Sequence, residues 1–145
     1  MSDLKLIALD AEDLDVVSAT TQDAIVRVGD MAFARGDRRF ALMMNRFAWE
    51  RGDGRSRDRA GVRKRAALHF DHVTGVRAAG LDLNAHEGVL ELLTIRFTEG
   101  QAPGGQVDLA FAGGATIRLE VEVLEARLQD LGAAWATKVK PEHAA

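Results

Sequence analysis

Two stretches near the C-terminal end of the chain alternate between apolar and polar or small residues. The first carries Val107, Leu109 and Phe111, and the second, after a Gly-Gly pair, carries Ile117, Leu119, Val121 and Val123. A period of two with one apolar face is typical of a half-buried strand. A three-residue turn over Gly113-Gly114-Ala115 pairs Phe111 with Ile117, Leu109 with Leu119 and Val107 with Val121, which keeps the apolar residues on one face. The pattern therefore predicts a β-hairpin with an odd-numbered turn.

A third strand is predicted from Val89 to Thr98, where Leu93, Ile95 and Phe97 alternate with polar residues. Pairing Phe97 with Val107 and Ile95 with Leu109 keeps the apolar faces in register. The same register places Arg96 opposite Asp108, and cross-strand pairs of opposite charge stabilise a sheet. Two separate criteria thus predict one register.

Helical spacing occurs on both sides of the strand-rich region. Leu124, Leu128 and Leu131 follow the hairpin at intervals of four and three, which predicts an amphipathic C-terminal helix ending at Gly132. A short N-terminal helix is predicted from Ala11 to Ala19. Asp10 is its expected N-cap, and Leu9 and Leu14 occupy the positions of a hydrophobic staple.

The rest of the chain predicts further strands: Leu4 to Ala8, Ala24 to Asp30, Met31 to Arg35 as its continuation or as the next strand, Arg38 to Glu50, Ala66 to Phe70, and Val73 to Ala78. The stretch Arg38 to Glu50 has apolar residues on both faces, which favours a central strand or one beneath a helix. The expected fold is α+β: about eight mainly antiparallel strands in a sandwich or partly closed barrel, capped by the two helices. A pleckstrin-homology-like barrel is the alternative, because the run of strands ends in one helix.

Length and composition narrow the setting. The 145 residues predict a single domain, residues 1–145, and residues 138–145 are expected to form a frayed tail. The absence of cysteine excludes disulfides and thiolate metal sites. The N-terminus lacks the pattern of a signal peptide, and no apolar run approaches the roughly 20 residues of a membrane span. We therefore expect a cytoplasmic protein that does not bind membranes.

Charge is distributed unevenly along the chain. The net charge is -3, but the stretch from Arg51 to Arg65 contains seven basic and two acidic residues. Residues 51–63 are polar and contain three glycines, which predicts a flexible basic loop. Its cations, with those that follow, are candidates for contact with an anion or a partner: Arg57, Arg59, Arg63, Lys64 and Arg65. No aromatic residue lies between them, which makes nucleic-acid binding by base stacking unlikely.

Other chemistry has little support in the sequence. His69 and His72 flank Asp71, but a metal needs three or four converging ligands, so we predict no metal site. The two histidines join the basic residues as candidates for anion or partner contact. The chain has no Gly-x-Ser-x-Gly elbow, P-loop or Rossmann fingerprint, so no catalytic residue and no cofactor are predicted.

Three stretches of the chain carry a family resemblance: LKLIALDAEDLDVVSATTQDAIVRVGD, RRFALMMNRFAWE and FAGGATIRLEVEVLEARLQDLGAAWATKVKP. They resemble a small uncharacterised bacterial family, domain of unknown function 2948, over nearly the whole chain. The resemblance implies a single domain and transfers no activity, ligand or catalytic residue.

Two hypotheses for the function follow. The first is a non-enzymatic binding or assembly module of the bacterial cytoplasm, with a homodimer or another protein as partner. The alternative is a small-ligand (anion) binding protein or an enzyme that uses the basic loop and the region of His69 and His72.

Overall fold

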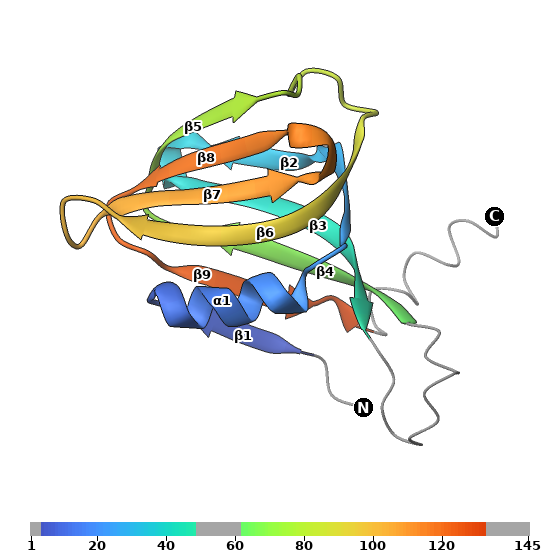
Figure 1. The fold of residues 1–145 in the computed structure, drawn as a ribbon, viewed down its shortest axis with the longest axis horizontal. Coiled ribbons are helices and arrows are strands. Elements are labelled where there is room, and N and C mark those ends of the chain that lie inside the picture. Colours follow the sequence, from blue (N-terminus) through green and yellow to red (C-terminus); the bar gives the residue numbers. More distant parts are fainter. Residues whose placement is uncertain (1–3, 49–61, 133–145) are drawn as a thin grey trace.

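The computed structural model describes residues 4–48 and 62–132 (Figure 1). These residues form nine strands, one α-helix and two short 3-10 turns: β1 (Lys5–Ala8), α1 (Ala11–Thr20), β2 (Ile25–Ala34), η1 (Arg35–Asp37), β3 (Arg39–Ala48), β4 (Val62–Phe70), β5 (Val73–Ala79), β6 (Val89–Glu99), β7 (Gly105–Phe111), η3 (Ala112–Gly114), β8 (Thr116–Val121) and β9 (Ala126–Asp130). The expected antiparallel α+β class is confirmed, with nine strands instead of about eight.

The strands form one open sheet in the order β1-β9-β4-β3-β2-β6-β7-β8-β5, and every pairing is antiparallel. The sheet curls, so that β6, β7 and β8 lie in front of β2, β3 and β4 (Figure 1). Helix α1 packs on β6 and β1, across the open side between them. The central position predicted for the strand with two apolar faces is confirmed, because β3 lies between β4 and β2.

A continuous apolar core fills the inside of the curl and includes residues from all nine strands and from α1. Leu14 and Val17 bring the helix into it, as its spacing predicts. Asp10 is the N-cap, with its carboxylate 2.8 Å from the backbone nitrogen of Asp13. Leu9 stays 61% exposed, so it adds little burial to the predicted staple. The core thus fixes which side of each strand faces inward.

The predicted register of β6 and β7 is confirmed: Ile95 pairs with Leu109, Arg96 with Asp108, and Phe97 with Val107. The predicted register of β7 and β8 is wrong by two residues. Leu109 pairs with Ile117, and Val107 pairs with Leu119. The apolar residues still share one face because a shift of two preserves the side of every residue.

The hairpin turn between β7 and β8 has an odd number of residues, as predicted, but begins one residue earlier. Its three residues are Ala112 to Gly114, closed by a 2.8 Å hydrogen bond from the Phe111 nitrogen to the Ala115 oxygen. Gly113 and Gly114 both have positive φ, a conformation that glycine adopts without strain. Ala115 is extended and buried instead, so it belongs to the strand side of the turn.

The predicted C-terminal helix is wrong, because residues 126–130 form β9. Ala126, Leu128 and Asp130 face inward and alternate with the exposed Arg127 and Gln129. A carboxylate at an inward position hides this period of two in the sequence. The pleckstrin-homology alternative depended on that helix and is not confirmed.

The predicted flexible loop, residues 51–63, lies partly outside the described residues. Residues 51–61 lie outside the described residues, whereas Val62 and Arg63 are the first residues of β4. The predicted frayed tail, residues 138–145, also lies outside the described residues.

Candidate functional site

Strand β4 divides the predicted basic cluster between two sides of the sheet. Ala66, Leu68 and Phe70 are buried, so Lys64 shares their inward side. Arg63 and Arg65 point outward, in line with His69. Three consecutive cations therefore do not converge on one point, as a small anion would require.

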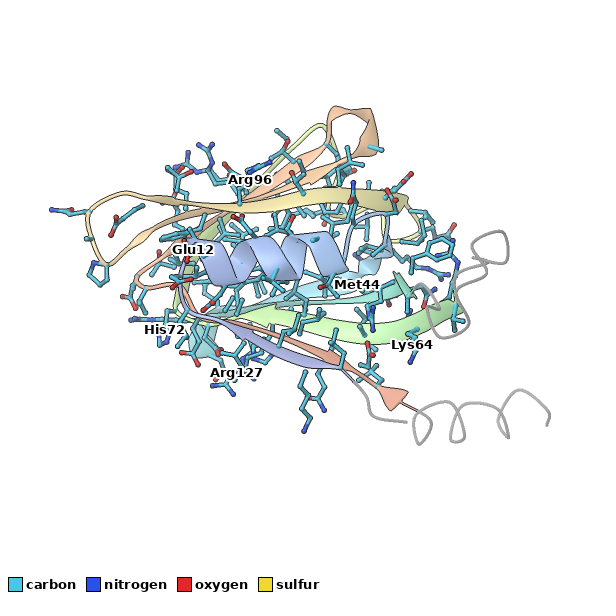
Figure 2. The ribbon with its side chains drawn as sticks, turned by 60° about the horizontal axis from the view of Figure 1, so that its bottom comes forward. Glu12, Met44, Lys64, His72, Arg96 and Arg127 are labelled. Carbon is cyan, nitrogen blue, oxygen red and sulfur yellow. The ribbon has the colours of Figure 1, made fainter. Side chains whose placement is uncertain are left out.

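The predicted candidates are also spread along the length of β4. Arg65 and His69 are four residues apart, about 13 Å along a strand. His72 lies beyond the strand, in the turn before β5. Figure 2 shows Lys64 and His72 at opposite ends of the molecule. Arg57 and Arg59 lie outside the described residues.

The outward positions of β1, β9, β4 and β3 form a surface that we call the outer face. Strand pairing aligns its residues in rows, and they are Lys5, Ile7, Arg39, Ala41, Met43, Asn45, Phe47, Arg63, Arg65, Ala67, His69, Arg127 and Gln129. The outward side of β3, which is the second of its two apolar sides, forms the centre of the outer face. Ala41, Met43 and Ala67 are partly exposed there. Within residues 4–48 and 62–132, α1 packs on the opposite side of the sheet and does not cover them.

The end of the outer face near Arg63 and Arg65, which we call the basic end, has few partners for its charges. The guanidinium of Arg63 lies 4.5 Å from the centre of the Phe47 ring. Arg65 reaches Oδ1 of Asn45 at 3.3 Å and Oδ2 of Asp30 at 3.4 Å, a long contact for an ion pair. In the part of the chain that the structure describes, neither Arg63 nor Lys64 has a carboxylate within ion-pair distance.

The opposite end of the outer face, near His69, has paired charges, and we call it the paired end. Nε of Arg39 donates to Oδ1 of Asp71 at 2.7 Å. This hydrogen bond, with the charge of Asp71, raises the pKa of Arg39. His69 lies 3.6 Å from the other oxygen of Asp71. Burial nevertheless lowers the pKa of His69 below its usual 6.5, against the attraction of Asp71.

A second set of ion pairs extends the paired end into the segment between β8 and β9. Glu125 accepts from Arg127 at 2.9 Å and lies 2.9 Å from Nε2 of His72. Hydrogen bonds from Arg127 and His72 lower the pKa of Glu125. Arg38 contacts both oxygens of Glu122 at 2.9 Å.

The backbone of the paired end is fixed as well. Arg38 and His72 have φ of 53° and 62°, a region that non-glycine residues adopt infrequently. Val73 donates its N–H to the Arg38 oxygen, and Glu122 donates to the His72 oxygen, both at 2.9 Å. These contacts hold the turn, so the paired end has the features of a structural cluster.

Sequence reasoning missed a buried ion pair on the inward side of the sheet, behind the basic end. Nε and Nη2 of Arg46 lie 2.8 and 2.9 Å from the two oxygens of Asp130, and the Leu4 nitrogen also donates to Asp130. Burial favours a raised pKa for Asp130, but the hydrogen bonds from Arg46 and Leu4 and the charges of Arg46 and Lys64 outweigh it, so the pKa is lowered. The sequence signal for this pair was a charged residue at an inward position of each strand, since two such residues of opposite charge can pair in the core.

Helix α1 was also missed as a candidate surface. Its carboxylates are Glu12, Asp13 and Asp15, and it contains no basic residue. Val16 is 55% exposed beside them. The signal that could have found this surface is the composition of the helix, which has three carboxylates and no basic residue.

One hollow of the described surface lies away from the predicted candidates that the structure describes. An open hollow of about 610 Å³ lies at the end of β6, β7 and β8 and is lined mainly by polar residues, among them Thr74, Glu99, Glu120 and Glu122. Of the sequence-predicted candidates that the structure describes, none lines it. Across the described ranges, no group of three or more histidines and carboxylates is arranged to hold a metal ion. Those ranges also contain no helix whose length and apolar character suffice to cross a membrane.

Comparison with known proteins identifies a family but no individual relative. The model of the family described as "Protein of unknown function (DUF2948)" matches residues 4–143. No curated protein matches the chain. No solved structure matches it. Its function is therefore inferred from its own residues.

Proposed function

Because the chain belongs to the DUF2948 family, whose function is unknown, we propose a function from its surface: it is a non-enzymatic binding module whose outer face contacts an acidic protein partner. The observation that carries this proposal is the charge of a partly apolar face that no element within residues 4–48 and 62–132 covers. Its strand positions hold no carboxylate and five cations, which are Lys5, Arg39, Arg63, Arg65 and Arg127. Arg39 and Arg127 pair with carboxylates at the paired end, and Arg65 has only a long contact of 3.4 Å with Asp30, so the charge available to a partner lies mainly at the basic end. Such a face attracts a partner of opposite charge.

The centre of the outer face supports a protein as the partner. Ala41, Met43 and Ala67 give a partly exposed apolar patch between the cations. Protein interfaces commonly combine an apolar centre with a polar rim. Phe47, the aromatic residue of this face, lies beneath the guanidinium of Arg63. Base stacking on this ring would require Arg63 to move, which disfavours a single-stranded nucleic acid.

The alternative, a small-ligand protein or enzyme, has weaker support. A small anion needs convergent donors, whereas Arg63 and Lys64 belong to opposite sides of β4. His69 and His72 contact carboxylates at the other end of the strand. The proposal includes a bacterial source and a cytoplasmic setting, both expected from the sequence.

Fluorescence anisotropy with a fluorescein-labelled oligoglutamate peptide tests the proposal. We expect saturable binding at low ionic strength that weakens as salt screens the charges. The double variant Arg63→Glu/Arg65→Glu should raise the Kd at least about tenfold, equivalent to about 1.4 kcal/mol.

The matched control is Arg77→Glu/Arg96→Glu, which makes the same change in net charge on β5 and β6, away from the outer face. It should change the Kd by less than about twofold. Equal losses in both double variants would show a nonspecific charge effect and contradict the proposal. Tighter binding of a single-stranded oligonucleotide than of the peptide, with the same dependence on Arg63 and Arg65, would also contradict it.

A further inference from the structure

Helix α1 presents an acidic stripe to solvent. Glu12, Asp15, Val16 and Ala19 are exposed and are spaced three or four residues apart, so they share one side of the helix. Val16 is an exposed apolar residue beside two carboxylates. The stripe therefore has the same combination of apolar contact and charge as the outer face, with the opposite sign.

We propose that the acidic partner of the outer face is α1 of a second copy of this chain. The inference rests on the proposed function, because it uses the same face and names its partner. In this contact Glu12 and Asp15 approach Arg63 and Arg65. Val16 and Ala19 pack on the apolar centre around Met43.

The two surfaces agree in length. Seven residues separate Glu12 from Ala19, about 10 Å along a helix. Arg63 and Ala67 are about 13 Å apart along β4. Small apolar side chains on both surfaces allow a close approach of helix and sheet, so one helix covers the basic end and the apolar centre together.

The geometry of one copy determines the kind of assembly. In Figure 2 α1 faces the viewer, whereas Arg127 of the outer face points downward, so the two surfaces point in different directions. A contact between two different surfaces is heterologous, and it forms a ring or an open chain instead of a twofold dimer. One helix offers a small contact area. We therefore expect weak, reversible and salt-sensitive association.

Sedimentation velocity of the unmutated protein at low ionic strength tests the inference. The weight-average sedimentation coefficient should rise with protein concentration, and the rise should disappear at 1 M salt, where the screening length is about 3 Å. Two variants should each remain monomeric under the same conditions: Glu12→Lys/Asp15→Lys, which reverses the helix, and Arg63→Glu/Arg65→Glu, which reverses the outer face.

An equimolar mixture of these two variants provides the decisive arm. The reversed helix of one variant then faces the reversed outer face of the other, and the unchanged surfaces also complement each other. Mixing should restore association to within about threefold of the unmutated protein. If Glu12→Lys/Asp15→Lys does not fold by circular dichroism, Asp15→Lys/Ala19→Lys replaces it.

A control variant separates the specific contact from net charge. Glu87→Lys/Glu91→Lys reverses two exposed carboxylates outside α1 and should leave the association of the protein unchanged. A monomeric unmutated protein at every concentration, or a mixture that stays monomeric, overturns the inference. Oligoglutamate binding that still depends on Arg63 and Arg65 would then preserve the proposed function with a different acidic partner. Loss of both results would reject both proposals.

Discussion

The two ends of β4 contain similar residues in very different surroundings. At the paired end, Arg39 and His69 lie beside Asp71, within 2.7 and 3.6 Å of its oxygens. At the basic end, Arg63 stacks on Phe47 and has no carboxylate within ion-pair distance among the described residues. Charged residues that lie close in sequence thus have two different roles. Pairing in three dimensions separates cations that stabilise the fold from cations that remain for a partner.

The largest effect is expected at the buried ion pair on the inward side of the sheet, behind the basic end. Asp130→Asn should lower the free energy of unfolding by about 3–5 kcal/mol, because it leaves the Arg46 guanidinium, with a side chain 9% exposed, without its partner charge. Urea denaturation measures the change. The matched control is Asp108→Asn, which breaks the exposed pair with Arg118 and should change the free energy by at most about 1 kcal/mol. Equal changes in the two variants would mean that burial does not distinguish the pairs.

The carboxylate of Asp130 also makes the stability of the protein depend on pH. The pKa of Asp130 is lowered below its usual 3.8, so its contribution to stability is fully present above that pH. The contribution is lost as the pH falls through the folded-state pKa. Urea denaturation below pH 4 should show a steeper decline for the unmutated protein than for Asp130→Asn. Parallel curves would contradict the assignment.

Removing a charge at the paired end should lower the free energy of unfolding less than Asp130→Asn does. Asp71→Asn removes the charge that attracts both Arg39 and His69, and these contacts are partly exposed. We expect a loss of about 0.5–1 kcal/mol in the free energy of unfolding. The pKa of His69 should fall further, because Asp71 opposes the lowering caused by burial. NMR titration of the His69 ring measures this shift, and a rise in its pKa would refute the pairing.

His69 itself should make stability depend on mild acid. Its folded-state pKa is lowered, so protonation favours the unfolded chain, and stability decreases as the pH falls from 6.5 through that pKa. His69→Gln should reduce this decrease in denaturation curves recorded at successive pH values. An unchanged pH dependence would show that another group is responsible.

The smallest effect on stability is expected at the outward side of the basic end. Arg63→Ala should change the free energy of unfolding by about 0.5 kcal/mol or less, because it removes one exposed cation–π contact with Phe47. A loss as large as that of Asp130→Asn would mean that Arg63 is structural, and it would remove the contrast between the two ends.

Much of the fold could be predicted where apolar alternation is clean. The β6–β7 register followed from Ile95, Phe97 and the pair of Arg96 with Asp108, and these pairings are the observed ones. The helix over residues 124–131 was wrong because Asp130 occupies an inward position of β9. A carboxylate is buried there because Arg46 neutralises it, and their 84-residue separation in sequence hides that partner.

The candidate site was predictable in its residue types but not in its arrangement. The basic cluster was assigned mainly to a loop, so the alternation of Arg63, Lys64 and Arg65 between two sides of β4 was not foreseen. Asp71 pairs with Arg39 and Glu125 pairs with His72, and these contacts depend on which strands are neighbours in the sheet: β4 lies between β3 and β9. The acidic stripe of α1 suggests a contact surface only when its charge is compared with that of the outer face.

Amide chemical-shift mapping by NMR tests the central claim most directly. Titration of the ¹⁵N-labelled protein with oligoglutamate at low ionic strength should shift the amides of Met43, Phe47, Arg63 and Arg65. The amides of His72 and Glu125 at the paired end should stay unchanged. Shifts that centre on the paired end or on β6 to β8, or an absence of shifts at the basic end, would contradict the account.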